Sequence, residues 1–94
     1  MLRTLADPLR FRIVELLGTE QLCTCHLVEM TGARQPNISN HLRILREIGL
    51  VESEPVGRFT YHRLVSDRLT GLSARLDTLA EQAQSAAAIR RPCG

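Results

Sequence analysis

The chain is poor in aromatic residues and has no lysine. Its 94 residues include no tryptophan, one tyrosine and two phenylalanines, so the core has to be aliphatic. The abundance of leucine and alanine favours helices. All twelve basic residues are arginine, and the formal net charge at pH 7 is only +2. A weakly basic balance of this kind is compatible with nucleic acid as a partner but does not by itself indicate one.

Long hydrophobic runs are also missing. No apolar stretch approaches the roughly 20 residues that a membrane-spanning helix needs, and the N-terminus lacks a signal-peptide pattern. We therefore expect a cytoplasmic protein whose cysteines are reduced thiols. There are three cysteines, Cys23, Cys25 and Cys93, and an odd number argues against a disulfide framework. The length is that of one domain, 1–94, whose modest core would gain from a partner subunit.

Helical patterns fill the first half of the chain. Asp7 stands directly before a proline, which is typical of an N-cap and a first helical position. Gly18 is a good helix stop. Because apolar residues recur at helical spacing between them, we expect a core helix over 8–17, with a shorter helix before it.

A second pair of helices is expected after a short polar segment, 19–24. The first runs from about Cys25 to Thr31, and Gly32 closes it. The second opens at Gln35 and the following proline, because proline is tolerated in a first turn. Its apolar residues recur every three or four positions and form one stripe: Ile38, Leu42, Leu45 and Ile48. A short helix, a tight turn and a longer helix, here spanning 25–48, make the helix-turn-helix pattern.

The period of the sequence changes after this helix pair, and 51–64 predicts a β-hairpin. Two candidate strands, 51–56 and 59–64, flank a two-residue loop that begins with Gly57, as a type II′ turn requires. Pro55 indicates that the first strand is an edge strand. A hairpin directly after a helix-turn-helix is a wing. We therefore predict a mostly α fold with a two-stranded β-wing, a winged helix-turn-helix of order α-α-α-α-β-β-α.

A long final helix is expected over 67–88, followed by a flexible tail over 89–94. Its apolar residues alternate spacings of three and four along about five turns, which is typical of a helix that packs on another helix. We expect this seam to form a homodimer, and the alternative is that it folds back on its own domain. The predicted dimer interface consists of Leu2, Leu5, Leu69, Leu72, Leu76, Leu79 and Ala83.

The second helix of the helix-turn-helix has a polar face rich in amides. Asparagine and glutamine can make paired hydrogen bonds to adenine, arginine reads guanine or phosphate, and serine reaches base edges or phosphate. A cation at the hairpin turn can contact phosphate or the minor groove. The alternative for both features is an ordinary solvated surface. The candidate DNA-binding residues are Gln35, Asn37, Ser39, Asn40, Arg43 and Arg58, with His41, Thr31, Arg34 and Arg63 ranked below them.

Cys23 and Cys25 stand one residue apart just before this helix pair. Thiolates bind soft ions well, but positions i and i+2 lie roughly 200° apart around a helix. Both sulfurs can hold one ion only if Cys23 lies outside the helix and Cys25 in its first turn, with Thr24 as the N-cap. A disulfide between them is expected to be strained. His26 is expected to point away, Cys93 is a candidate third sulfur from either subunit, and the alternative is a pair of small buried residues.

These motifs resemble the ArsR/SmtB family of winged-helix metalloregulatory repressors along nearly the whole chain. The residues that carry the resemblance are 5–13, 22–27, 35–42 and Gly57-Arg58. The resemblance implies a homodimer that binds operator DNA when metal-free and leaves it when an inducer binds. The family's metal box reads Leu-Cys-Val-Cys-Asp-Leu, and this chain has Thr24 for valine and His26 for aspartate. Arsenic-responsive members add a cysteine where this chain has Val28, and the final helix lacks the histidines of the family's other common site.

The sequence therefore predicts a DNA-binding repressor released by trivalent arsenic or antimony bound to Cys23, Cys25 and Cys93. One alternative is the same repressor responding to cadmium or lead. Another is a thiol-redox sensor in which Cys93 forms a disulfide with one of the pair. A more remote alternative is a winged-helix protein-interaction module without metal. An enzyme is not expected, because no nucleophile, base and orienting residue form a recognisable set.

Overall fold

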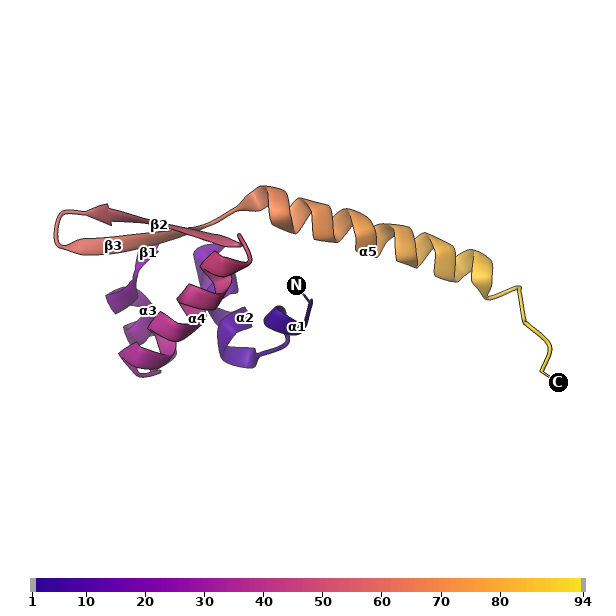
Figure 1. The fold of residues 1–94 in the computed structure, drawn as a ribbon, viewed down its shortest axis with the longest axis horizontal. Helices are drawn as coiled ribbons and strands as arrows, with labels where there is room; N and C mark the ends of the chain where they lie inside the picture. Colours follow the sequence, from indigo (N-terminus) through magenta and orange to yellow (C-terminus); the bar gives the residue numbers. More distant parts are fainter. Residues whose placement is uncertain (1, 94) are drawn as a thin grey trace.

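The computed structural model describes residues 2–93, which form a small head and one long projecting helix (Figure 1). The molecule measures 63 × 24 × 20 Å along its principal axes. None of the helices within the described residues is long and apolar enough to cross a membrane. The elements in chain order are α1 (Leu2–Leu5), α2 (Pro8–Leu17), β1 (Leu22–Cys23), α3 (Thr24–Thr31), α4 (Gln35–Glu47), β2 (Val51–Val56), β3 (Phe59–Leu64) and α5 (Ser66–Ala86).

The start of α2 has the cap that its sequence indicates. A carboxylate oxygen of Asp7 accepts a hydrogen bond from the backbone N–H of Arg10 at 3.0 Å, and Pro8 is the first helical residue. This hydrogen bond also lowers the pKa of Asp7 below its ordinary value. The apolar side of α2 then faces α3 and the sheet. The fully buried side chains of this aliphatic core are Ile13, Leu27, Ile38, Leu42, Leu45 and Leu50.

The pair α3 and α4 is joined by a tight turn at Gly32. This glycine has φ of +71°, a left-handed conformation that glycine adopts without steric penalty, and it ends α3. Pro36 lies in the first turn of α4 and leaves its hydrogen-bonding pattern intact. Ile38, Leu42 and Leu45 are buried along one side of α4, so its polar side is left on the surface. This is the expected helix-turn-helix.

The sheet contains one strand more than the sequence indicated. Its order is β1-β3-β2 and all pairs are antiparallel. Residues 19–24 were expected to be a polar connection, yet Leu22 pairs with His62 and Cys23 with Tyr61. A two-residue strand is too short to show a period, which is why the pattern missed it. The wing itself, β2 and β3, turns at Gly57 with φ of +62°, and Pro55 does lie on an edge strand.

Helix α5 runs from Ser66 to Ala86, so it begins one residue before the expected start at 67 and ends two residues before the expected end at 88. Its N-cap residue is Val65, and no side chain makes a capping hydrogen bond. None of its residues is buried in the chain. Leu69 packs against the core of the head, whereas Leu76 is 45% and Leu79 is 59% exposed. The alternative that this seam folds back on its own domain is therefore wrong for most of the helix. With this addition of β1, the predicted fold class, mostly helical with a β-wing, is confirmed.

Candidate thiolate site and nucleic-acid interface

The cysteine pair lies where a strand turns directly into a helix. Cys23 ends β1 and is also the N-cap residue of α3, with extended backbone angles of φ −83° and ψ 166°. Cys25 is the second residue of α3. Cys23 is buried and Cys25 is exposed. The two sulfurs can therefore meet because Cys23 lies outside the helix, although the N-cap is Cys23 and not Thr24 as expected.

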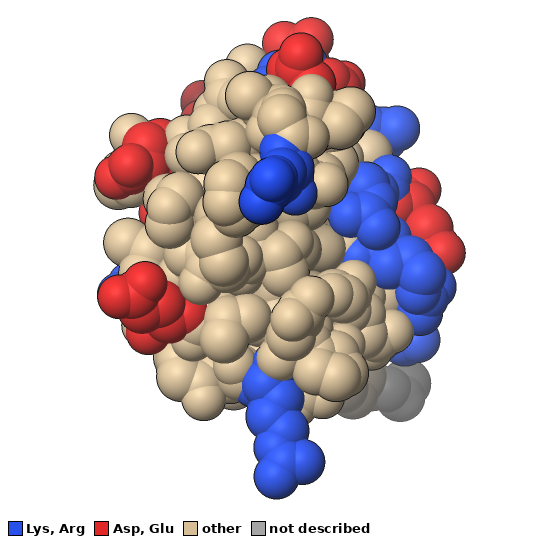
Figure 2. All heavy atoms as spheres, turned by 90° about the vertical axis from the view of Figure 1, so that its left-hand side faces the viewer, with Lys and Arg blue, Asp and Glu red and all other residues tan. Residues whose placement is uncertain are grey.

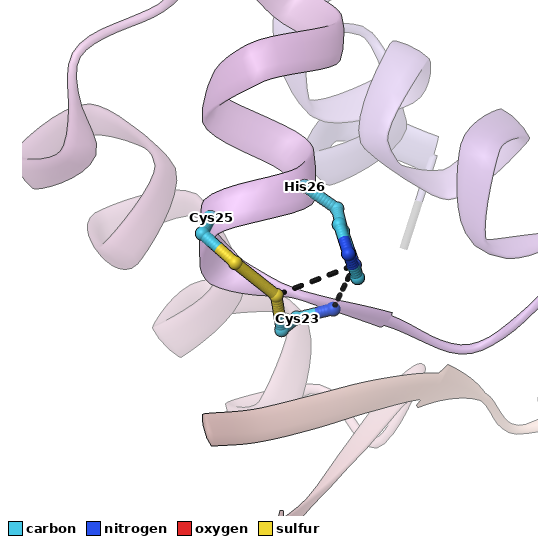
Figure 3. Close-up of side chains that lie close together, drawn as sticks. All are labelled: Cys23, Cys25 and His26. Carbon is cyan, nitrogen blue, oxygen red and sulfur yellow. Dashed lines mark hydrogen bonds between the residues drawn. A yellow bond between two sulfur atoms is a disulfide. The ribbon is translucent and has the colours of Figure 1, made fainter. Parts of the chain in front are cut away.

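In the structure the sulfurs of Cys23 and Cys25 are joined as a disulfide (Figure 3). This bond differs from the prediction of reduced thiols, and from the expectation that a disulfide between residues i and i+2 is strained. Its physical basis is the extended backbone at Cys23, which sets the two Cα atoms 5.4 Å apart, a separation that is ordinary for disulfides. Only the reduced, dithiol form can bind a metal ion, because thiolates are the ligands.

His26 lies in this cluster, contrary to the expectation that its ring points away. Its Nδ1 accepts a hydrogen bond from the backbone N–H of Cys23 at 3.1 Å and lies 3.3 Å from the sulfur of Cys23 (Figure 3). The potential ligand atoms of Cys23, Cys25 and His26 all lie within 4.8 Å of one another. The signal was the three-residue spacing of a capping box, which brings the third helical residue back to the N-cap.

Cys93 is not part of this cluster within one chain. It is exposed and lies in the tail beyond α5. Figure 1 shows the C-terminus at one end of the long axis, whereas β1 and α3 lie in the head toward the other end. The head and α5 are separated in this way because α5 leaves the sheet without folding back. A third sulfur for the pair cannot come from the tail of the same chain in this conformation.

The polar side of α4 is exposed as a continuous surface. Arg43 is held in place by neighbours on its own helix, because its guanidinium donates to Asn40 Oδ1 at 2.8 Å and to Glu47 Oε1 at 2.7 Å. Figure 2 shows the end of the molecule that carries the wing, where basic side chains gather along one edge and much of the centre is uncharged. The structure leaves all six candidate DNA-binding residues exposed on α4 or at the wing turn: Gln35, Asn37, Ser39, Asn40, Arg43 and Arg58.

The lower-ranked DNA candidates mostly have partners inside the protein. His41 accepts a hydrogen bond from Arg10 Nε at 3.1 Å, which ties α4 to α2. Thr31 donates to the carbonyl of Leu27 at 2.6 Å within α3. Arg63 forms an ion pair with Glu52 on the neighbouring strand. These contacts give His41, Thr31 and Arg63 structural roles in the head.

One buried polar residue escaped the sequence analysis. His62 on β3 is only 2% exposed, and both ring nitrogens have hydroxyl partners. Its Nε2 lies 2.9 Å from Thr24 Oγ1 and its Nδ1 lies 2.7 Å from Ser53 Oγ. Burial lowers the pKa of His62 below its ordinary value, and the charge of Arg46 lowers this pKa further. The alternation of the strand placed His62 on its inner face, but only the folded chain brings its partners together.

A hairpin directly after an α3–α4 pair defines a winged helix-turn-helix protein. The family described as "Bacterial regulatory protein, arsR family" matches residues 7–53, which is half of the chain. The chain belongs to this family, and it is a transcriptional regulator of the ArsR/SmtB kind, as its motifs indicated.

Two relatives in sequence are repressors. The HTH-type transcriptional repressor SmtB of Mycobacterium tuberculosis is 37% identical over 86 residues, which are 92% of this chain but only 62% of that protein. The arsenical resistance operon repressor of Staphylococcus xylosus is 32% identical over 79 residues, which are 84% of this chain and 76% of that repressor. This chain therefore spans about three fifths of the length of the first relative.

Solved structures agree with the fold. A possible transcriptional regulator for arsenical resistance superimposes with a TM-score of 0.76 at 35% identity and covers 96% of both chains. The homodimeric winged helix-turn-helix DNA-binding domain Mb0332 of Mycobacterium bovis superimposes with a TM-score of 0.68 at 26% identity, over 85% of this chain and 74% of that one.

Acidification is expected to destabilise the protein through His62. Because the folded-state pKa of His62 lies below 6.5, the unfolded chain takes up a proton more readily at this ring. The contribution of His62 to the free energy of unfolding is therefore full above pH 6.5 and falls as the pH drops through 6.5 toward the folded-state pKa. Urea unfolding at fixed protein concentration, from about pH 7.5 to 5.5, measures this loss. The change His62→Gln should flatten the dependence, and an equally steep dependence in both proteins would contradict the assignment.

Proposed function

We propose that the protein is a homodimeric transcriptional repressor that leaves its operator when a thiophilic ion binds Cys23 and Cys25. The observation that carries this proposal is the position of the pair. Their sulfurs meet at the start of α3, and α3 packs directly against α4, whose polar side is exposed. An ion that holds both sulfurs constrains the first turn of α3. It can release DNA only if it binds the DNA-free arrangement more tightly than the DNA-bound one.

We propose trivalent arsenic or antimony as the inducer. Two thiolates are available at this site, and soft thiolate ligands select soft ions. The names of the Staphylococcus xylosus repressor and of the similar solved structure both refer to arsenical resistance. A pyramidal trivalent ion takes three ligands, so the pair needs a third. Cys93 of a second copy would supply a third sulfur, and this choice favours arsenic or antimony.

Cadmium or lead is the alternative inducer if His26 completes the site. The His26 ring already lies beside Cys23, and a set of two sulfurs and one nitrogen suits borderline metals better than trivalent arsenic. In this arrangement the present hydrogen bond from the backbone of Cys23 to Nδ1 would have to break or the ring would have to turn. The third ligand therefore decides which ion is preferred.

The disulfide favours a second candidate function, which is repression controlled by thiol oxidation. Two thiols become a disulfide when they give up two protons and two electrons to an oxidant such as a peroxide. The sequence predicted Cys93 as one partner of such a bond, whereas the structure pairs Cys23 with Cys25. Oxidation would constrain the same first turn of α3 that metal binding does. We propose a cytoplasmic location, which a DNA target and a need for reduced thiols both favour.

The seam of α5 is proposed to hold two copies together. Leu76 and Leu79 lie exposed beside Leu2, which is itself 58% exposed, and these three residues line one groove together with Leu72. Arg3 and Arg75 also line this groove, so it is an apolar surface with two basic side chains, and exposed leucines grouped in this way on a small chain are typical of a subunit interface. The structurally similar Mycobacterium bovis domain is homodimeric. A two-fold dimer would also present two α4 helices to successive turns of DNA.

Metal binding should depend on both cysteines of the pair. Reduced protein on a duplex selected in vitro from random DNA is titrated with arsenite, antimonite, cadmium, lead and zinc, and fluorescence anisotropy reports release. The changes Cys23→Ser and Cys25→Ser should each raise the half-release concentration by more than the about 10–100-fold expected for losing an outer-shell partner.

The third ligand is identified by two more variants in the same titration. Cys93→Ser should impair the response to arsenite if Cys93 completes a three-sulfur site. His26→Gln keeps a cap acceptor and should impair the response to cadmium if His26 is a ligand. Release of DNA by peroxide but by none of the ions would select the redox alternative. If reduced wild-type protein is released by none of these ions, the metal-sensor proposal is wrong.

DNA binding should depend on the exposed amides and hydroxyl of α4. Changing Asn37, Ser39 and Asn40 together to alanine should abolish preference for the selected duplex, because each good base contact contributes about 1–3 kcal/mol of discrimination. Arg58→Ala should weaken binding to all sequences alike and reduce the salt slope by about one unit. Gln21→Ala, an exposed amide outside α4, is the control. A triple variant that keeps its sequence preference would refute the reading-helix assignment.

The dimer should depend on the apolar seam of α5. Leu76→Glu and Leu79→Glu place a charge in the proposed interface and should convert the protein to a monomer in sedimentation velocity runs at several concentrations. Ala74→Glu, on the opposite side of the helix, is the control and should leave the association unchanged. A wild-type protein that sediments as a monomer at all concentrations would contradict the proposal.

A further inference from the structure

A chain of four polar side chains crosses the head from α3 to α4. Thr24 of α3 contacts His62 of β3 at 2.9 Å, and His62 contacts Ser53 of β2 at 2.7 Å. Arg46 of α4 then donates to Ser53 Oγ at 3.3 Å. All four line one cavity of about 280 Å³ between α3, α4 and the sheet, together with Ser39, Leu42 and Thr60.

The donor and acceptor groups of the four side chains indicate which partner donates in each hydrogen bond. Arginine has only donors, so Ser53 Oγ accepts from Arg46. Its own hydroxyl hydrogen is then free to point at His62 Nδ1, which is an acceptor in a neutral ring. With Ser53 donating to Nδ1, we assign the ring proton to Nε2, which then donates to Thr24 Oγ1. Every link is thus satisfied when His62 is neutral.

The middle of the chain is shielded from water. His62 is 2% exposed and is the only buried polar or charged side chain in the described part of the molecule. A buried ring that loses a hydrogen-bond partner cannot replace it with bulk water. If the hydrogen bond at one side of the His62 ring is lost, the ring and its other hydroxyl partner therefore have to reorient. Buried polar networks of this kind tend to have discrete arrangements.

The hydrogen-bonded chain of side chains begins at the proposed thiolate site and ends at the proposed DNA-reading helix α4. Thr24 is the residue between Cys23 and Cys25, so an ion that holds both sulfurs also sets the position of its hydroxyl. Arg46 projects from the last turn of α4 and is exposed. A second contact runs parallel, because the His26 ring lies edge-on to Tyr61, with centroids 6.1 Å apart. Thr24 and His26, which flank Cys25, therefore both contact β3.

We propose that the chain Thr24–His62–Ser53–Arg46 couples the thiolate site to the wing and the reading helix. In the metal-free protein it holds β2, β3 and the end of α4 in one arrangement. Ion binding moves the Thr24 hydroxyl away from His62, the ring and Ser53 reorient, and Arg46 is released from the wing. The inference rests on the proposed function, and it assigns to His62 and Thr24 a positioning role without contact to ion or DNA.

The test compares DNA affinity with and without a saturating ion in wild-type protein and in variants of Thr24. Arsenite and cadmium are the probes, under reducing conditions. Thr24→Val has nearly the same shape and lacks the hydroxyl. It should still bind the selected duplex and the ion, but the ratio of the two DNA dissociation constants should fall at least five-fold. Thr24→Ser keeps the hydroxyl and should retain the wild-type ratio, and Thr19→Val, which loses only a local hydrogen bond at the end of α2, is the matched control.

A double-mutant cycle shows whether the residues act as one chain. Ser53→Ala breaks the next link, so the double variant Thr24→Val, Ser53→Ala should lose no more coupling than the more affected single variant. Independent roles would make the two losses multiply. Nitrogen NMR of the His62 ring should show the proton on Nε2 in the metal-free protein and a changed environment after ion binding.

The outcomes separate this inference from the proposed function. If wild-type protein does not bind DNA or is released by none of the ions, the proposed function fails. If wild-type protein responds and Thr24→Val responds equally, the function stands and the coupling chain is wrong. Multiplying losses in the double variant, or a His62 ring unaffected by the ion, would also overturn the chain.

Discussion

The backbone of Cys23 serves a sheet and a helix at the same time. In its extended conformation it pairs with Tyr61 across the sheet, and it also provides the N-cap of α3. The same conformation turns its sulfur toward Cys25 and draws the His26 ring back over the cap. The thiolate site therefore exists because β1 is held by β3. A site of this kind is sensitive to the wing, because the strand that orders the ligand is the inner strand of the wing itself.

Within the described residues, one polar side chain, that of His62, is buried in the head. Its core is aliphatic, and His62 is the buried exception among the described residues. A histidine with two hydroxyl partners is a directional element in a core that otherwise packs without directional bonds. It lies between the residues that bind the ion and those that face DNA in the proposed function. The aliphatic core is shared by α2, α3, α4 and the sheet, and the polar chain through His62 links α3 to α4 by way of β3 and β2.

Helix α5 leaves the head with its apolar seam uncovered. The sheet ends at Leu64, and Ser66 already starts a helix that points away from the core, so only Leu69 reaches the core of its own chain. A second copy would cover the remaining leucines and so complete the small core that one chain provides. The same geometry removes Cys93 from the thiolate site of its own chain, so a role for Cys93 at that site requires the other copy.

The sequence by itself determined the elements whose signals are local. The cap at Asp7, the stripe of α4 and the turn at Gly57 are set by neighbours within about one helical turn or one hairpin, and the helix-turn-helix with its wing follows from them. The dithiol and the polar side of α4 could be recognised for the same reason.

Only the tertiary structure decided the contacts between distant residues. β1 needs β3 as a partner, Thr24 and His62 are 38 positions apart in the sequence, and a strand of two residues shows no period of its own. The approach of His26 to Cys23 depended on which residue caps α3, and this was set by the strand before it. Long-range pairing and burial make these choices, because a hydrogen bond between distant residues has no signature in their spacing along the chain.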